Sequence, residues 1–125
     1  MASEGLHESE AKLKPATIDH HRAITSVMEE LEAVDWYDQR VDAASDDELR
    51  GILAHNRDEE KEHAMMVLEW LRRRDGVLDA HMHTYLFTEE PVTEIEAEVE
   101  AADGTDAASS TGELGIGSLR EEPAR

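Results

Sequence analysis

Residues 55–66 read HNRDEEKEHAMM, and this stretch decides how the rest of the chain is interpreted. Apolar residues on both sides of it recur at steps of three and four, which indicates one face of an α-helix. Within the stretch, the same face carries Asn56, Glu60 and His63 where apolar side chains are expected. Glu60 and His63 form a Glu-x-x-His motif, so their side chains lie about one helical turn apart on one face. Burying such groups is costly unless they are paired or bind a metal, so the motif predicts a polar site at a helix interface.

The pattern around this stretch predicts two long helices that together cover residues 16–74. Pro15 suits the first turn of the first helix, because proline has a fixed φ and lacks the N–H that a first turn leaves unpaired. Ser45 and Glu48 have the spacing of a capping box, which predicts the start of the second helix. Only a few residues join the two helices, so we expect an antiparallel hairpin. The apolar stripe of the first helix is Ile24, Val27, Leu31 and Val34.

Less regular sequence follows the hairpin. Gly76 is expected to end the second helix, since glycine is the usual residue just beyond a helix C-terminus. Thr93 and Glu96 form another capping box, which predicts a short C-terminal helix. No run of strands is evident, so the predicted class is all-α.

A second carboxylate in an unusual position lies on the first helix. Glu30 is at the edge of the apolar stripe, so in a hairpin it can face Glu60 and His63. One Glu together with one Glu-x-x-His is half of the di-iron carboxylate pattern of four-helix bundles. Two copies related by a two-fold axis would supply four carboxylates and two imidazoles, enough for two metal ions. The ligand count therefore predicts a dimer that forms a four-helix bundle, although a lone Glu-x-x-His also arises by chance on charged helices.

Neighbouring residues allow two interpretations each. Glu29 and Glu32 fit a solvated helix face, or a secondary metal site near the dimer axis. Trp36 and Tyr37 fit ordinary packing, although Tyr37 shares the face of Glu30 and could contact the groups that hold a metal.

Composition excludes several classes of function. The chain has 125 residues, the size of one domain, and a net charge of −19. Such a charge argues against partners with phosphate backbones and against anionic membranes. The absence of cysteine excludes disulfides and thiolate metal sites. No signal peptide or membrane-spanning run is evident, so a soluble, cytoplasmic protein is expected. Acidic residues are densest over residues 29–62, where they would attract cations.

Changes in composition divide the chain into four parts. Residues 1–14 are expected to be a flexible N-terminus and residues 15–100 the helical domain. Residues 101–112 are small and polar, which predicts a flexible linker. Residues 113–125 form a tail with an apolar segment, LGIGSLR, at 114–120.

Four segments resemble the encapsulated ferritins: EELEAVDWY at 29–37, HNRDEEKEHAMM at 55–66, LEWLRR at 68–73 and TYLFTE at 84–89. The tail segment LGIGSLR resembles the targeting peptide that docks cargo inside encapsulin shells. The resemblance covers nearly the whole chain apart from its extreme termini.

The resemblance implies a two-helix half-ferritin whose dimers rebuild a four-helix ferroxidase centre, with five dimers closing into a ring-shaped decamer. By motif position, it implies the iron ligands Glu30, Glu60 and His63. It further implies an additional metal site at Glu29 and Glu32. Trp36 would lie beside that additional site, and Tyr37 would lie close to the iron pair.

The resemblance also implies an activity and a location in the cell. Members of the family oxidise Fe(II) with O₂, and the encapsulin shell stores the mineral, so a location inside an encapsulin nanocompartment in the cytoplasm is implied. The implied targeting residues are Leu114, Gly115, Ile116, Gly117, Ser118, Leu119 and Arg120. The alternative is a non-catalytic, metal-binding scaffold or cargo protein with a structural metal at the dimer interface. Zn²⁺ or Ca²⁺ are the other ions that the same or the secondary site would accept.

Overall fold

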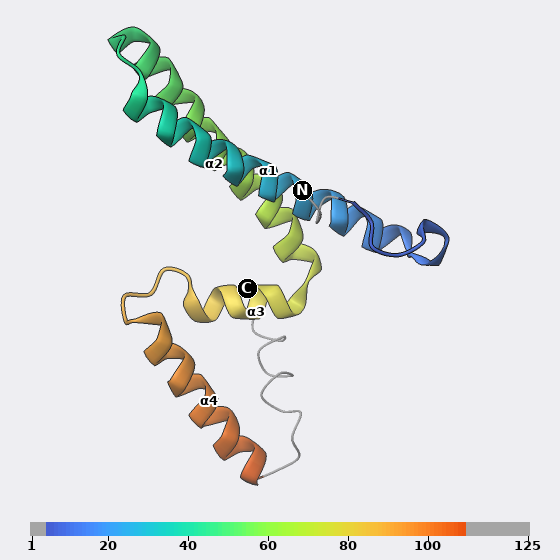
Figure 1. The fold of residues 1–125 in the computed structure, drawn as a ribbon. Coiled ribbons are helices and arrows are strands. Elements are labelled where there is room, and N and C mark those ends of the chain that lie inside the picture. Colours follow the sequence, from blue (N-terminus) through green and yellow to red (C-terminus); the bar gives the residue numbers. More distant parts are fainter. Residues whose placement is uncertain (1–4, 110–125) are drawn as a thin grey trace. The chain divides into compact units, whose positions relative to one another are not determined.

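The computed structural model describes residues 5–109, and over that range it is helical, with no strand (Figure 1). The predicted all-α class is confirmed. Of the described residues, those from 5 to 71 belong to one compact unit and those from 72 to 109 to a second. The elements are a 3-10 turn, Glu10–Lys12, and four helices: α1 (Pro15–Ala43), α2 (Asp47–Arg74), α3 (Gly76–Tyr85) and α4 (Val92–Ser109).

Helices α1 and α2 form the predicted antiparallel hairpin, and they lie side by side in Figure 1. Near the turn, Nη1 of Arg57 on α2 lies 3.2 Å from Oδ1 of Asp38 on α1. Toward the other end, the rings of His20 and Trp70 meet edge to face, with centroids 5.5 Å apart. These two contacts fix the register, because each pairs a residue of α1 with the residue of α2 that an antiparallel hairpin places opposite it.

The turn of the hairpin is closed by a side chain from α2. The guanidinium of Arg50 donates hydrogen bonds to the backbone oxygens of Val41 and Ala44, at the end of α1. The last carbonyl groups of a helix have no partner within the helix, so a cation is a favourable partner there. Arg50 therefore ties the start of α2 to the end of α1.

Helix α2 begins later than the capping box predicts. The side chain of Asp46 accepts a hydrogen bond of 2.8 Å from the backbone N–H of Leu49, and the helix starts at Asp47. The prediction that Ser45 and Glu48 form the cap was wrong. The carboxylate of Asp46 satisfies one of the unpaired N–H groups of the first turn and also interacts favourably with the positive end of the helix dipole.

The second unit begins with a helix that the sequence pattern does not predict. Oδ1 of Asp75 accepts hydrogen bonds of 3.0 Å from the backbone N–H groups of Val77 and Leu78, and so caps α3. Gly76 was expected to end the second helix, but it is the first residue of α3, because the cap at Asp75 starts a new helix at once. Within this unit, buried Asp79 accepts a hydrogen bond from Arg72.

Helix α4 differs from its prediction in both bounds. It starts at Val92, so Thr93 lies inside the helix and is not its cap, and it continues to Ser109. Residues 101–109 are therefore helical in the structure, where composition predicts the beginning of a linker. Alanine has the highest intrinsic helix propensity, which accounts for continued helix through this alanine-rich segment. Residues 110–112 and the tail at 113–125 lie outside the described residues.

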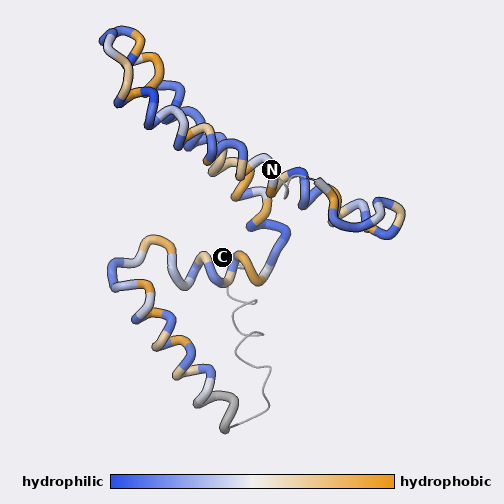
Figure 2. Tube along the Cα trace, in the orientation of Figure 1, coloured by the Kyte–Doolittle hydropathy of each residue, from blue (hydrophilic) through white to orange (hydrophobic). Residues whose placement is uncertain are grey.

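Within residues 5–109 the chain has a small apolar core. The buried apolar residues are Ala23, Ala64, Leu71, Ala80 and Ile95, and none of the larger side chains described is fully buried. Along α1 and α2, hydrophobic and hydrophilic residues alternate, as Figure 2 shows. No helix in the described part of the chain is long and apolar enough to cross a membrane. Several large apolar side chains of the hairpin are about half exposed: Ile24, Leu31, Leu49, Ile52, Met65 and Met66.

Candidate metal centre

Three potential metal ligands meet between α1 and α2. Glu30 projects from the middle of α1, and Glu60 and His63 project from α2 one turn apart, as the helix period requires for residues three apart. One ligand atom from each of the three lies within 4.8 Å of the others. The structure thus brings together the three residues that the sequence pattern selects.

The imidazole of His63 lies close to both carboxylates. Its Nδ1 is 3.4 Å from Oε1 of Glu60 and 3.9 Å from Oε2 of Glu30. The two carboxylate side chains are about a quarter exposed, at 27% for Glu30 and 23% for Glu60, whereas that of His63 is 45% exposed. His63 was expected on the face that points into the core. It lies instead at the open edge of the hairpin, where a ligand or another chain can reach it.

The pKa values of the two carboxyl groups shift in opposite directions. A hydrogen bond to Glu60, then burial, then the negative charge of Glu60 raise the pKa of Glu30. The pKa of Glu60 is lowered, first by the hydrogen bond with Glu30 and also by His63. Glu30 is therefore the first of the two carboxyl groups to take up a proton as pH falls. A cation that binds between them replaces this proton and removes the repulsion of the two charges.

The donor set suits a hard or borderline divalent cation. Two carboxylates and one imidazole are ligands that iron, zinc and manganese accept in proteins. Three donors leave coordination positions open, as a site that reacts with a small molecule requires. The chemistry of the residues present therefore fits a metal ion, and one chain supplies only half of the ligands that a two-metal carboxylate site uses.

An ion-pair network lies one turn from the centre. Arg57, whose side chain is 24% exposed, contacts Asp38 across the hairpin and Asp58 on its own helix, at 3.2 and 3.1 Å. These carboxylates raise the pKa of Arg57, and Arg57 lowers the pKa of Asp58. The contact with Asp38 joins the two helices on the side of the centre that lies toward the turn of the hairpin.

The other residues that the sequence selects lie outside this cluster. Glu29 is exposed and Glu32 is half-buried, and neither belongs to a group of three potential ligands in the described region. Glu29 does contribute to the raised pKa of Glu30. Trp36 is 49% exposed, and Tyr37 is half-buried two turns beyond Glu30. The targeting segment expected at 114–120 lies beyond the residues that the structure describes.

Sequence reasoning did not select one residue that contacts both Trp36 and Tyr37. The guanidinium of Arg40 lies over the rings of both Trp36 and Tyr37, 5.8 and 5.5 Å from their centroids. The spacing could have revealed it, because residues three and four apart on a helix are neighbours.

Comparison with known proteins identifies the family. A family model described as EncFtn-like matches residues 5–89, which include all three residues of the cluster. The chain belongs to the EncFtn-like family. The resemblance to encapsulated ferritins is thereby confirmed.

Two curated relatives match almost the whole of this EncFtn-like protein. An "Encapsulated ferritin-like protein" of Rhodospirillum rubrum is 60% identical over 131 residues, which covers 99% of this chain and 94% of the relative. A "Ferritin-like protein" of Thermotoga maritima is 48% identical over 117 residues, which covers 94% of this chain and 99% of the relative.

Two further similarities concern parts of the chain. An "Encapsulin nanocompartment cargo protein EncC" of Myxococcus xanthus is 38% identical over 52 residues, 42% of this EncFtn-like chain and 40% of the relative. A crystal structure of a protein from Nitrosomonas europaea superimposes with a TM-score of 0.69 at 58% identity. It covers 70% of this chain and 97% of that chain, so most of the described residues have an experimentally observed counterpart.

Proposed function

We propose that this EncFtn-like protein is a ferroxidase, which oxidises Fe(II) to Fe(III) with O₂ at a di-iron centre between two subunits. It would deliver the iron for mineral storage inside an encapsulin nanocompartment. The observation that carries the proposal is the convergence of Glu30, Glu60 and His63 within 4.8 Å. Iron is both the substrate of this reaction and the ion for which the ligands are suited. Two Fe(II) held side by side can each give one electron to O₂, so neither iron alone has to supply both.

The ligand count and the exposed surface support a dimer. One chain offers two carboxylates and one imidazole, so a second copy is needed for four carboxylates and two imidazoles. His63, at 45% exposure, lies where a facing chain can reach the same ions. Large apolar side chains also remain half exposed on both helices of the hairpin, and a chain with so small a core gains stability by burying them. We further propose, from the family resemblance, that the dimers assemble into a ring-shaped decamer.

A secondary metal site at Glu29 and Glu32 is proposed on the route by which iron reaches the centre. Trp36 lies one turn beyond Glu32, so it is placed beside that site. Tyr37 occupies the same face as Glu30 and is proposed to lie close to the bound iron pair. Zn²⁺ and Ca²⁺ are the other ions that these sites could hold. The net charge of −19 would raise the local concentration of Fe²⁺.

Residues 114–120 are proposed to be the peptide that binds the encapsulin shell. Support comes from the names of two relatives, one called an encapsulated ferritin-like protein and the other an encapsulin nanocompartment cargo protein. Leu114, Ile116 and Leu119 would fill shallow pockets of the shell wall, and the glycines between them permit close backbone approach. Deletion of residues 113–125 should then abolish loading into shells and leave iron oxidation unchanged.

The test is the aerobic oxidation of Fe(II) by the metal-free protein, followed by absorbance. Native protein should oxidise Fe(II) several times faster than buffer does. Glu60→Ala and His63→Ala should reduce the rate to that of buffer, whereas Glu62→Ala, an exposed carboxylate on the same helix, should leave it unchanged. A native rate equal to that of buffer would instead favour the alternative, a non-catalytic scaffold with a structural metal.

A second experiment tests the shared site. Because the ligands would come from two chains, metal should shift the native protein toward a larger species in size-exclusion chromatography. Glu30→Ala should lose this shift. A distribution of sizes that is the same with and without metal would contradict a site between subunits.

A further inference from the structure

An arginine without a carboxylate partner lies over two aromatic rings that are about two turns of α1 from Glu30. In the described part of the chain Arg22, Arg50, Arg57 and Arg72 each form an ion pair with an aspartate, but Arg40 forms none. Its guanidinium instead lies 5.5 Å from the ring centroid of Tyr37 and 5.8 Å from that of Trp36. In a chain with 31 acidic residues, a cation that contacts rings and no acid is unexpected.

Both rings lie within reach of the proposed iron chemistry. Tyr37 is seven residues from Glu30, and Trp36 is seven from Glu29 and four from Glu32, so on α1 the separation along the axis is about 10 Å or less. Tyrosine and tryptophan are the side chains most easily oxidised by one electron in a chain that has no cysteine. Iron that meets hydrogen peroxide is a source of such oxidants.

We propose that Arg40 protects Trp36 and Tyr37 from one-electron oxidation during iron turnover. This inference rests on the proposed ferroxidase function for its biological setting. The positive charge of Arg40 is attracted to the electron-rich face of each ring. Loss of an electron, before the proton leaves, makes the face of the ring more positive, so at this step the ring and the guanidinium repel each other. The charge of Arg40 therefore makes loss of an electron less favourable at both rings.

The chemistry involves hydroxyl radical as the oxidant. Fe(II) and hydrogen peroxide give Fe(III), hydroxide and hydroxyl radical. Tyr37 then loses one electron and its phenolic proton to the radical, which becomes water, and the phenol becomes a neutral phenoxyl radical. Trp36 reacts in the same way, with loss of one electron and then of its indole N–H proton. Arg40 takes no part in either bond change and acts only through its charge.

The test uses an oxidant that needs no iron. Azide radical is a neutral one-electron oxidant, so it is not repelled by Arg40, and each radical that takes an electron from a ring becomes azide ion. Metal-free native protein and its variants would receive the same dose, and the oxidised fraction at each ring would be measured by peptide mass spectrometry. Trp70, which contacts His20 at the other end of the hairpin, serves as an internal reference.

Arg40→Gln should increase the oxidised fraction at Trp36 and Tyr37 several-fold relative to Trp70. Arg40→Lys should stay close to native, because lysine keeps the positive charge. Lysine lacks the flat guanidinium, so this variant separates the effect of charge from that of packing. A role in packing alone would make the lysine variant behave as the glutamine variant does. An unchanged ratio of Trp36 to Trp70 in Arg40→Gln would overturn the proposal. Since no iron is present, this result is independent of whether the protein oxidises Fe(II).

Discussion

Replacement of Glu30 by glutamine should stabilise the metal-free protein and abolish its response to metal. At pH 7.5 the native chain holds the carboxylates of Glu30 and Glu60 within 4.8 Å of each other. At that separation, two full charges repel by about 0.9 kcal/mol in water and by about 3.5 kcal/mol at an effective dielectric constant of 20. Both side chains are about a quarter exposed, so a value near the lower end, about 1 kcal/mol, is expected.

The amide introduced by Glu30→Gln removes this repulsion and can donate a hydrogen bond to Glu60. The gain in the free energy of unfolding of the glutamine variant should depend on pH. Because the pKa of Glu30 is raised in the folded chain, the protonated carboxyl group stabilises the fold. This stabilisation is complete at low pH and is lost as pH rises through the raised pKa. The glutamine variant does not suffer that loss, so its advantage should be present at pH 7.5 and absent near pH 4.

Thermal unfolding measured by circular dichroism, at one fixed protein concentration, is a suitable assay. A gain of about 1 kcal/mol corresponds to a rise of roughly 4 °C in Tm for a chain of this size. Zinc, which is redox-inert and accepts these ligands, should raise the Tm of native protein and of Glu62→Gln but not that of Glu30→Gln. A Glu30→Gln variant that unfolds below native protein at pH 7.5, or that still responds to zinc, would refute the reasoning.

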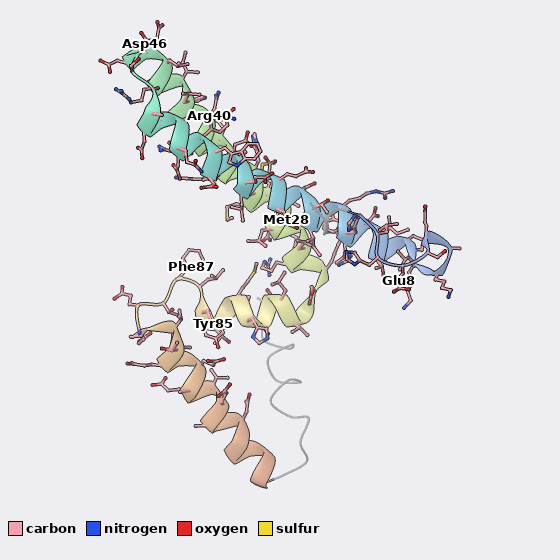
Figure 3. All side chains as sticks on the ribbon, viewed as in Figure 1. Glu8, Met28, Arg40, Asp46, Tyr85 and Phe87 are labelled. Carbon is pink, nitrogen blue, oxygen red and sulfur yellow. The ribbon has the colours of Figure 1, made fainter. Side chains whose placement is uncertain are left out.

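Three further predictions concern metal affinity, the core of the hairpin and an exposed loop. Zinc affinity, measured by calorimetry, should fall as pH drops through the raised pKa of Glu30, by about tenfold for each pH unit below that pKa. A zinc affinity that does not depend on pH would contradict a carboxylate site. Ala64, fully buried in the hairpin, has no room for a larger side chain, so Ala64→Leu should cost about 1–3 kcal/mol in urea unfolding, whereas exposed Met65→Leu should cost less than about 0.5 kcal/mol. Phe87, on the loop between α3 and α4 (Figure 3), is wholly exposed and has a φ of 62°, a conformation that favours glycine. Phe87→Gly should therefore stabilise the chain by about 1 kcal/mol, and Phe87→Ala should not. A loss of stability in the glycine variant would mean that the ring is buried in an assembly.

The hairpin and its site could be predicted because both depend on the helix period. The apolar stripe through Val27 and Val34 places Glu30 near the centre of α1, and the spacing of Glu60 and His63 fixes them on one face of α2. A short connection leaves the antiparallel hairpin as the simplest arrangement, and in it these residues meet.

The helix ends could not be predicted to the residue, because adjacent side chains compete for the same role. Ser45 and Asp46 can both cap a helix, and only the structure shows that Asp46 accepts the bond from Leu49. In the same way, Gly76 suits the end of one helix, but Asp75 caps a new one at that point. The helix α3 itself is short, and its ten residues give little periodic signal.

The exposure of His63 and the contacts of Arg40 depend on tertiary structure. A stripe gives the direction of a side chain only to within a fraction of a turn, so residues at its edge can face the core or the solvent. The position of the Arg40 guanidinium over two rings depends on side-chain conformations that neither composition nor spacing determines.

A crystal structure of the protein soaked with Fe(II), with anomalous data collected at the iron edge, tests the central claim most directly. The account predicts two iron peaks between a pair of chains, each within bonding distance of Glu30, Glu60 or His63 from both. Iron peaks bound by one chain alone, or no peak at these three residues in fully soaked crystals, would contradict it.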